Sequence, residues 1–147
     1  MYKRQWLGWK HFIYLGETGE DEDIFSELCH KYIGKPYRRF KAKGTPDYFA
    51  MSDEEAIQAE LWVNEHFYLM PSINDFTIEK FYDNVSDIEN QFNVKFDTTL
   101  IDPVGDIQGF KYDLEYLAQK LKYVRRTSKK YNRICLLYTS PSPRDRS

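Results

Sequence analysis

The sequence predicts an α/β fold with a mostly parallel sheet flanked by helices. Short apolar runs of strand length alternate along the chain with longer amphipathic runs of helix length, an order typical of β-α-β units. The strand-length runs are apolar throughout, as expected for strands that helices cover on both faces. The 147 residues, of which 41% are hydrophobic and 30% are charged, suffice for one such domain.

Composition argues against several classes of protein. The formal net charge of −2 provides no bulk attraction to nucleic acid or to anionic lipid. No apolar run approaches the ~18 residues of a transmembrane helix, and no secretory signal is visible at the start. The two cysteines, Cys29 and Cys135, cannot form a disulfide framework. We therefore expect a cytoplasmic protein without a membrane partner.

Both ends of the chain resemble translated sequencing adapter. Residues 135–145 read CLLYTSPSPRD, which matches the translation of the adapter of a transposase-based sequencing library. Residues 1–5 (MYKRQ) match the other strand of the same transposon end. We therefore expect residues 1–5 and 135–147 to be adapter and residues 6–134 to be an internal segment of a longer gene. The alternative is a natural tail rich in Pro and Ser, and genomic DNA continuous across Ile134 would favour it.

The first third of the chain contains a predicted strand, helix and loop. Residues 12–15 (FIYL) form a short apolar run typical of a buried strand. The acidic residues 20–23 predict a helix start, because acidic side chains favour the positive end of the helix dipole. Gly34 and Pro36 predict the end of this helix, and the polar residues 35–51 predict a long loop. The expected apolar stripe of the helix comprises Ile24, Phe25, Leu28 and Tyr32.

The middle of the chain predicts a capped helix followed by a strand. Ser52 and Glu55 form a capping box, in which each side chain bonds the backbone of the other residue. The helix behind it runs to about His66, and residues 67–70 form an apolar run typical of a strand. Its expected apolar positions are Ile57, Leu61 and Trp62.

The last part predicts two more helices and two more strands. Thr77 caps a helix whose apolar stripe is Ile78, Phe81, Tyr82, Val85, Ile88 and Phe92. Residues 98–101 (TTLI) form the next strand. The final helix has the expected stripe Leu114, Leu117, Ala118, Leu121 and Val124. A fourth strand begins at Ile134.

Two acidic residues follow predicted strands and are the candidate site. Glu17 follows residues 12–15 and Gly16, and Asp102 follows residues 98–101. Because ligands of open α/β sheets bind beyond the carboxyl ends of the strands, both side chains would project from one edge. Asp102 is the candidate Mg²⁺ residue, and Glu17 is the candidate base that activates water. Alternatively, Asp102 ends the strand in a turn and Glu17 is a solvated loop acid.

Other patterns for chemistry are weak. The sequence contains no G-x-x-x-x-G-K-[S/T] phosphate loop. Cys29 and His30 are a poor chelating pair, because adjacent helix positions point about 100° apart. The basic residues within 37–43 alternate with aromatic ones and could contact phosphate or stack on bases, with a solvated basic loop as the alternative.

Four motifs in order carry a family resemblance. They are YIGKPY (32–37), MSDEE (51–55), WVNEHFYLMP (62–71) and LIDP (100–103). With these motifs in this order, the chain resembles the RecA-type ATPase domain of hexameric replicative DNA helicases. The resemblance is to helicases of the DnaB and Twinkle kind, especially phage-type members. The resemblance covers nearly all of residues 6–134 and implies a partial RecA-like domain.

The resemblance also implies roles for particular residues. Asp102 corresponds to the Walker B acid, which holds Mg²⁺ through water, and Glu17 to the catalytic carboxylate beside the γ-phosphate of ATP. The segment 103–111 corresponds to a DNA-facing loop, but Gly105 and Asp106 depart from the Trp/Phe-Asn pair common there. The parent protein would be a homo-oligomer, a hexameric ring that translocates on single-stranded DNA.

The same resemblance implies parts that these residues lack. The phosphate loop would precede Trp6, and the sensor strand and arginine finger would follow Ile134. We therefore expect this chain alone to be inactive as an ATPase. Two alternatives remain open: another RecA-fold ATPase of recombination or repair, and a non-enzymatic α/β interaction protein whose acidic residues are structural.

Overall fold

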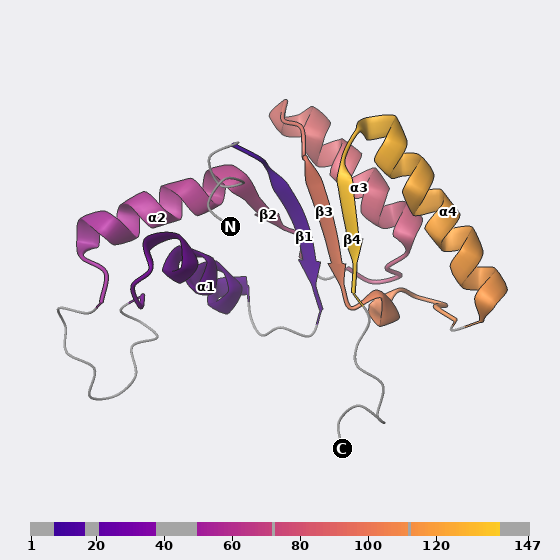
Figure 1. Ribbon diagram of the computed structural model, residues 1–147, viewed down its shortest axis with the longest axis horizontal. Helices are drawn as coiled ribbons and strands as arrows, with labels where there is room; N and C mark the ends of the chain where they lie inside the picture. The colour runs from indigo at the N-terminus through magenta and orange to yellow at the C-terminus, as the bar shows by residue number, and fades with distance from the viewer. Residues whose placement is uncertain (1–7, 17–20, 38–49, 72, 112, 139–147) are drawn as a thin grey trace, which may run out of the picture. The chain divides into compact units, whose positions relative to one another are not determined.

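The computed structural model has an α/β fold and describes residues 8–16, 21–37, 50–71, 73–111 and 113–138. Four strands form one sheet in the order β2-β1-β3-β4, and all strands run parallel (Figure 1). The predicted parallel α/β fold is thereby confirmed. The elements are β1 (His11–Leu15), α1 (Asp21–Ile33), α2 (Asp53–His66), β2 (Phe67–Leu69), α3 (Ile78–Phe92), β3 (Thr98–Asp102), α4 (Leu114–Tyr131) and β4 (Ile134–Leu137).

The chain divides into two compact units. The sheet unit comprises residues 1–17 and 68–147, and the helix-pair unit comprises residues 18–67. The sheet unit therefore contains β1, β3, β4, α3, α4 and all of β2 except its first residue, whereas the helix-pair unit contains α1 and α2. Among the described residues, none of the helices combines the length and apolar character needed to cross a membrane.

The core of the sheet unit lies between one face of the sheet and α3. The register pairs Phe12 with Thr99 and Tyr14 with Ile101, so these four side chains share a face. All four are buried, and Phe12 is fully buried against the rings of its neighbours. The side chains that α3 adds to this core are Ile78, Phe81, Tyr82, Val85 and Ile88. Phe92, also expected in this stripe, is 58% exposed because it lies in the last turn of α3.

Both helices of the sheet unit lie on the same face of the sheet (Figure 1). The connections from β2 to β3 and from β3 to β4 cross the sheet in the same direction. Right-handed crossovers therefore place both connecting helices on one side. Ile134 and Leu136 point to the other face of β4 and are each 42% exposed. Within the described sheet unit, the expectation that helices cover both faces is thus wrong at β4.

The predicted apolar stripe of α4 is only partly confirmed. Leu114 is 87% exposed and Leu121 is 54% exposed, while Val124 is buried as expected. The face that α4 presents to α3 instead includes Lys120, whose ammonium binds Glu79 at 2.6 Å, and Tyr123, whose ring lies 6.0 Å from that of Tyr82. Tyrosine rings and the aliphatic stem of lysine supply the contact surface that the apolar pattern assigned to leucines.

The helix-pair unit has a small core of its own. Its buried side chains are Cys29, Met51, Ala59 and Val63. The rings of Tyr32 and Trp62 stack at 4.3 Å and join α1 to α2. Ile57 and Leu61, expected to be core positions, are 59% and 67% exposed. They lie on the outer side of α2 because the partner helix contacts the side that carries Ala59 and Val63.

The predicted helix ends agree with the structure. The Ser52 hydroxyl accepts the Glu55 N–H at 3.1 Å, and the Glu55 carboxylate accepts the Ser52 N–H at 3.0 Å. Thr77 caps α3 by accepting the Lys80 N–H at 3.1 Å. Gly34 ends α1 with a left-handed φ of 80°, which glycine adopts without strain.

Candidate functional site at the carboxyl edge of the sheet

The carboxyl ends of β1 and β3 lie side by side. Asp102 is the last residue of β3 and pairs with Leu15 of β1 in the parallel register. The Gly16 N–H donates to the Asp102 carbonyl at 2.8 Å and extends this pairing past the end of β1. The Asp102 side chain is half-buried at this edge. Glu17 follows directly but lies outside the described residues, so its predicted position beside Asp102 stays a prediction.

A second carboxylate, that of Asp106, lies at the same edge. Asp106 ends a single turn of 3₁₀ helix, Val104–Asp106, and its Oδ2 accepts a hydrogen bond from the Tyr14 hydroxyl at 3.1 Å. A Cβ added to Gly16 would lie 1.7 Å from that Oδ2. Since carbon and oxygen cannot approach so closely, the Asp106 carboxylate occupies its position only because residue 16 has no side chain.

The loop after β3 is a packed structure. Val104 and Ile107 are buried in the core of the sheet unit. The Val104 N–H donates to the Tyr138 carbonyl at 2.7 Å, and the Gln108 N–H donates to the Phe76 carbonyl at 2.6 Å. Because both apolar side chains and backbone hydrogen bonds hold the loop, the position of Asp106 is defined. The DNA-facing role of residues 103–111 stays a prediction.

The two described carboxylates suit a hard cation. Carboxylate oxygens are preferred ligands of Mg²⁺, which often takes one or two of them and completes its shell with water and phosphate oxygens. Within the described ranges, no three His, Cys, Asp or Glu side chains lie together in a way that would hold a metal ion. Asp102 and Asp106 each supply a carboxylate after the end of β3, and that of Asp106 accepts the Tyr14 hydroxyl.

Sequence reasoning missed two contributors to this edge. Tyr14 belongs to the apolar run FIYL, and its hydroxyl gave no sign that it would bond across to a loop. Asp106 was considered only as a departure from a family pattern. Its position four residues after Asp102, in a loop that begins at a strand end, was the available signal.

Two other predicted sites were the basic loop and the pair Cys29-His30, and only the pair lies within the described residues. The basic residues from 38 to 43 lie outside the described residues. Cys29 is fully buried and His30 is exposed on α1, so the two side chains point in different directions. Burial, followed by the nearby Glu60 carboxylate, raises the pKa of the Cys29 thiol to about 11, which disfavours the thiolate that binds metals.

No known family profile matches this chain, and a search of curated proteins finds no similar sequence.

Proposed function

We propose that the chain is part of the RecA-type motor domain of an ATP-dependent, hexameric replicative DNA helicase. One observation supports this best: Leu15 pairs with Asp102 in the parallel register, so β1 and β3 end at the same edge of the sheet, and Glu17 follows Leu15 by two residues in the sequence. An acid at the end of one strand and an acid just beyond its neighbour suit a pair that acts on one nucleotide.

In this proposal the two acids have separate tasks. Asp102 would hold Mg²⁺ through a water molecule, and the bound ion would supply positive charge for the phosphates of ATP. Glu17 orients the attacking water and accepts its proton. Hydrolysis drives movement of a homo-oligomeric ring along single-stranded DNA. The phosphates require a phosphate loop, which the 147 residues do not contain.

The decisive experiment begins with the source DNA. Sequencing outward from the codons of Trp6 and Ile134 should reveal a G-x-x-x-x-G-K-[S/T] motif upstream and a different strand in place of residues 135–145. In the longer protein, Glu17→Gln should lower the DNA-stimulated ATPase rate by about 100-fold or more, as expected for loss of a general base. Nucleotide binding should persist in this variant.

A matched acid serves as the control. Asp113 is exposed and caps α4 by accepting the Tyr116 N–H at 2.8 Å. Asp113→Asn preserves an oxygen for this cap, so the ATPase rate should stay near that of the unmodified protein. A parent gene without a phosphate loop, or a Glu17→Gln variant that hydrolyses ATP at full rate, would overturn the proposal.

One observation favours a non-enzymatic alternative. The Asp106 carboxylate accepts the Tyr14 hydroxyl, which is a structural use of an acid at this edge. If Asp102 is structural too, the protein is an α/β interaction module. In that case the parent gene contains no phosphate loop, and Asp102→Asn alters stability without affecting any nucleotide-dependent activity.

A further inference from the structure

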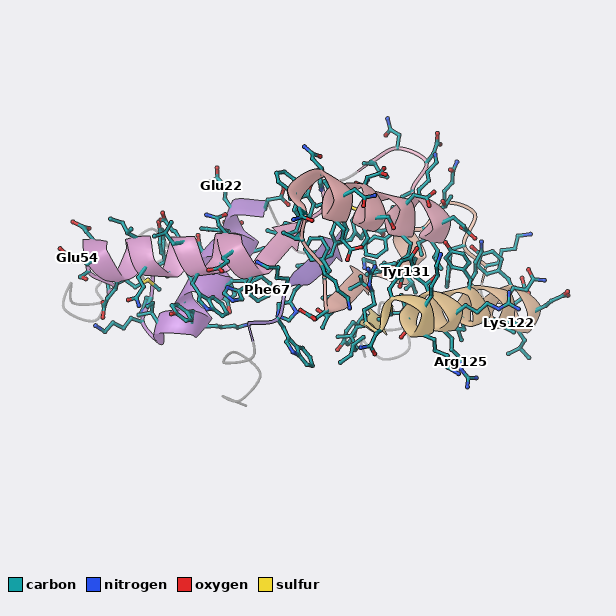
Figure 2. All side chains as sticks on the ribbon, turned by 90° about the horizontal axis from the view of Figure 1, so that it is seen from above. Glu22, Glu54, Phe67, Lys122, Arg125 and Tyr131 are labelled. Atoms are coloured by element: carbon teal, nitrogen blue, oxygen red, sulfur yellow. The ribbon has the colours of Figure 1, made fainter. Side chains whose placement is uncertain are left out.

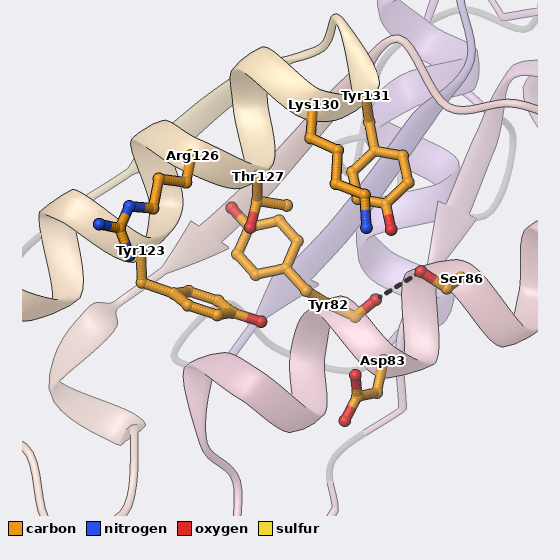
Figure 3. Close-up of a pocket in the computed structure, with 8 residues that line it drawn as sticks. All are labelled: Tyr82, Asp83, Ser86, Tyr123, Arg126, Thr127, Lys130 and Tyr131. Atoms are coloured by element: carbon orange, nitrogen blue, oxygen red, sulfur yellow. Dashed lines mark hydrogen bonds between the residues drawn. The ribbon is translucent and has the colours of Figure 1, made fainter.

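A cleft of about 500 Å³ lies between α3 and α4 in the sheet unit (Figure 3). Its wall is formed by the helical layer, whereas the candidate catalytic acids belong to the strand ends. Its lining residues are Tyr82, Asp83 and Ser86 of α3 and Tyr123, Arg126, Thr127, Lys130 and Tyr131 of α4. A volume of this size is within the range of small-molecule sites, roughly 300–1,000 Å³.

Helical spacing explains how these side chains gather. Counted from Tyr123, the other four lining residues of α4 lie three, four, seven and eight positions further along, which places all five on one face of the helix. Tyr82 and Thr127 are buried and close the floor of the cleft. Arg126 and Lys130 are exposed and stand one turn apart at its rim.

Positive charge dominates the cleft. Arg126 and Lys130 face a single lining acid, Asp83. Behind the wall, Arg133 has a 1% exposed side chain, and its guanidinium carbon lies 4.8 Å from the centre of the Tyr131 ring. This guanidinium pairs with Glu89 at 2.7 Å, but its Nε and the other terminal nitrogen have no partner among the described residues. The Arg133 guanidinium thus lies over the Tyr131 ring while Glu89 balances its charge, so the positive charge at the cleft comes from Arg126 and Lys130.

Two tyrosines give the cleft aromatic surface beside these cations. Tyr123 is half-buried, and burial, followed by the charge of Asp83, raises its pKa, so its hydroxyl is neutral. The Lys130 ammonium lies 4.9 Å from the centre of the Tyr131 ring. Its hydrogen bond to the Tyr131 hydroxyl lowers the pKa of that phenol. Aromatic rings next to cationic groups are the combination with which proteins hold nucleotide units.

We propose that this cleft binds a nucleotide unit, with its phosphate on Arg126 and Lys130 and its base against Tyr123. Arg and Lys favour phosphate oxygens, and Asp83 can accept a hydrogen bond from a sugar hydroxyl or a base amino group. The site goes beyond the proposed function, because it uses neither Glu17 nor Asp102. A free nucleoside monophosphate and one nucleotide of a single strand offer the same chemistry.

A titration of the 147-residue chain with adenosine monophosphate tests the proposal, with amide chemical shifts in NMR spectra as the readout. The largest shifts should fall on α3 and α4 around the lining residues. Arg126→Gln combined with Lys130→Gln should weaken binding about tenfold or more, since both charge-assisted contacts are lost. Asp102→Asn should leave this binding unchanged, which separates the cleft from the proposed ATPase site.

The same helix offers a control with equal charge. Arg125 and Lys129 are exposed neighbours on α4 that do not line the cleft, and Figure 2 shows Arg125 pointing away from α3. Arg125→Gln combined with Lys129→Gln removes the same charge and should alter the dissociation constant by less than about twofold. Equal weakening by both pairs would indicate general electrostatic attraction and would overturn the proposal.

Three further probes define the ligand. Inorganic phosphate should bind more weakly than adenosine monophosphate, and Tyr123→Leu should reduce that difference by removing the stacking surface. Equal affinity for the two probes would overturn the nucleotide assignment. A short single-stranded oligothymidylate identifies the source: tighter binding than the monophosphate indicates a strand, and weaker binding indicates a free nucleotide. Failure of every phosphate probe to shift the lining residues would overturn the site.

Discussion

The sheet unit and the helix-pair unit are stabilised by contacts of different range. In the sheet unit, Phe12 packs on Phe81 and Phe96, which come from distant parts of the chain. In the helix-pair unit, the capping box joins Ser52 to Glu55 within one turn. The rings of Tyr32 and Trp62 connect helices that follow each other directly. Local capping signals therefore describe the helix ends well, whereas the sheet and the packed faces of the helices depend on partners that no local pattern identifies.

The largest expected effect comes from truncation of the sheet-unit core. Phe12→Ala should lower the free energy of unfolding by about 3–5 kcal/mol, because it removes a fully buried ring and leaves a cavity. Urea unfolding followed by circular dichroism measures this loss. Phe92→Ala, at a 58% exposed ring, is the matched control and should cost less than about 0.5 kcal/mol. Equal losses would mean that the sheet-unit core is not where stability resides.

A smaller loss is expected at the carboxyl edge. Gly16→Ala should cost about 1–3 kcal/mol, since the new methyl group forces the Asp106 carboxylate away from Tyr14. In an Asp106→Gly background the same substitution loses its closest clash, with the Tyr14 hydroxyl oxygen still 3.0 Å away, and should cost less. A double-mutant cycle by urea unfolding measures the coupling. Identical costs in both backgrounds would show that the close approach of Gly16 and Asp106 does not occur.

A variant at the N-terminal cap of α2 tests whether local contacts stabilise the helix-pair unit. Ser52→Ala removes the hydroxyl that accepts the Glu55 N–H and should cost about 1 kcal/mol, while the backbone N–H of residue 52 still donates to the Glu55 carboxylate. Amide hydrogen exchange should accelerate at the start of α2 and stay unchanged in β1 and β3. Thr77→Ala is the counterpart in the sheet unit, where one hydrogen bond is lost at α3. Faster exchange throughout the sheet after Ser52→Ala would contradict the local origin of this stability.

The smallest effect concerns the ion pair between α3 and α4. Burial, the largest single influence, raises the pKa of Glu79, but the hydrogen bond from Lys120, a backbone hydrogen bond and the charge of Lys120 together outweigh it and hold this pKa below its usual 4.5. The hydrogen bond to Glu79 raises the pKa of Lys120 above 10.5. The pair's stabilisation is thus present between these two values. It is lost as pH falls through the lowered pKa of Glu79 and as pH rises through the raised pKa of Lys120.

Solvent limits the size of this contribution. The Glu79 side chain is 45% exposed, so the pair is worth about 0.5 kcal/mol or less. The measurement is the free energy of unfolding against pH for the unmodified chain and for Glu79→Gln. The two curves should differ slightly near neutral pH and converge in acid, below the lowered pKa of Glu79, where its carboxyl group is protonated. A constant gap down to acidic pH would exclude the ion pair as its cause.

Predictions from sequence were most reliable where the interacting residues are close together in the chain. The stop at Gly34, the capping box at Ser52 and the cap at Thr77 each involve a few neighbouring residues, and all three agree with the structure. They were least reliable for the faces of helices. The sequence of α4 offers both a leucine stripe and a tyrosine-lysine stripe, and packing on α3 selected the second.

At the candidate site, too, one residue could be placed from the local sequence and another only from the tertiary structure. The position of Asp102 directly after an apolar run was enough to place it at the end of β3, since side-chain alternation and strand length are properties of the local chain. The contact of Asp106 with Tyr14 needs the strand order β2-β1-β3-β4, which brings β1 next to the loop after β3.

By itself, the sequence determined the fold class, the order of strands and helices, and most of their ends, because hydrophobic periodicity and capping act over a few residues. Only the tertiary structure decided which face of α4 is buried, which carboxylate approaches Gly16, and which side chains line the cleft between α3 and α4. The physical reason is that these outcomes depend on the free energy of packing between segments far apart in the chain, which local patterns do not contain.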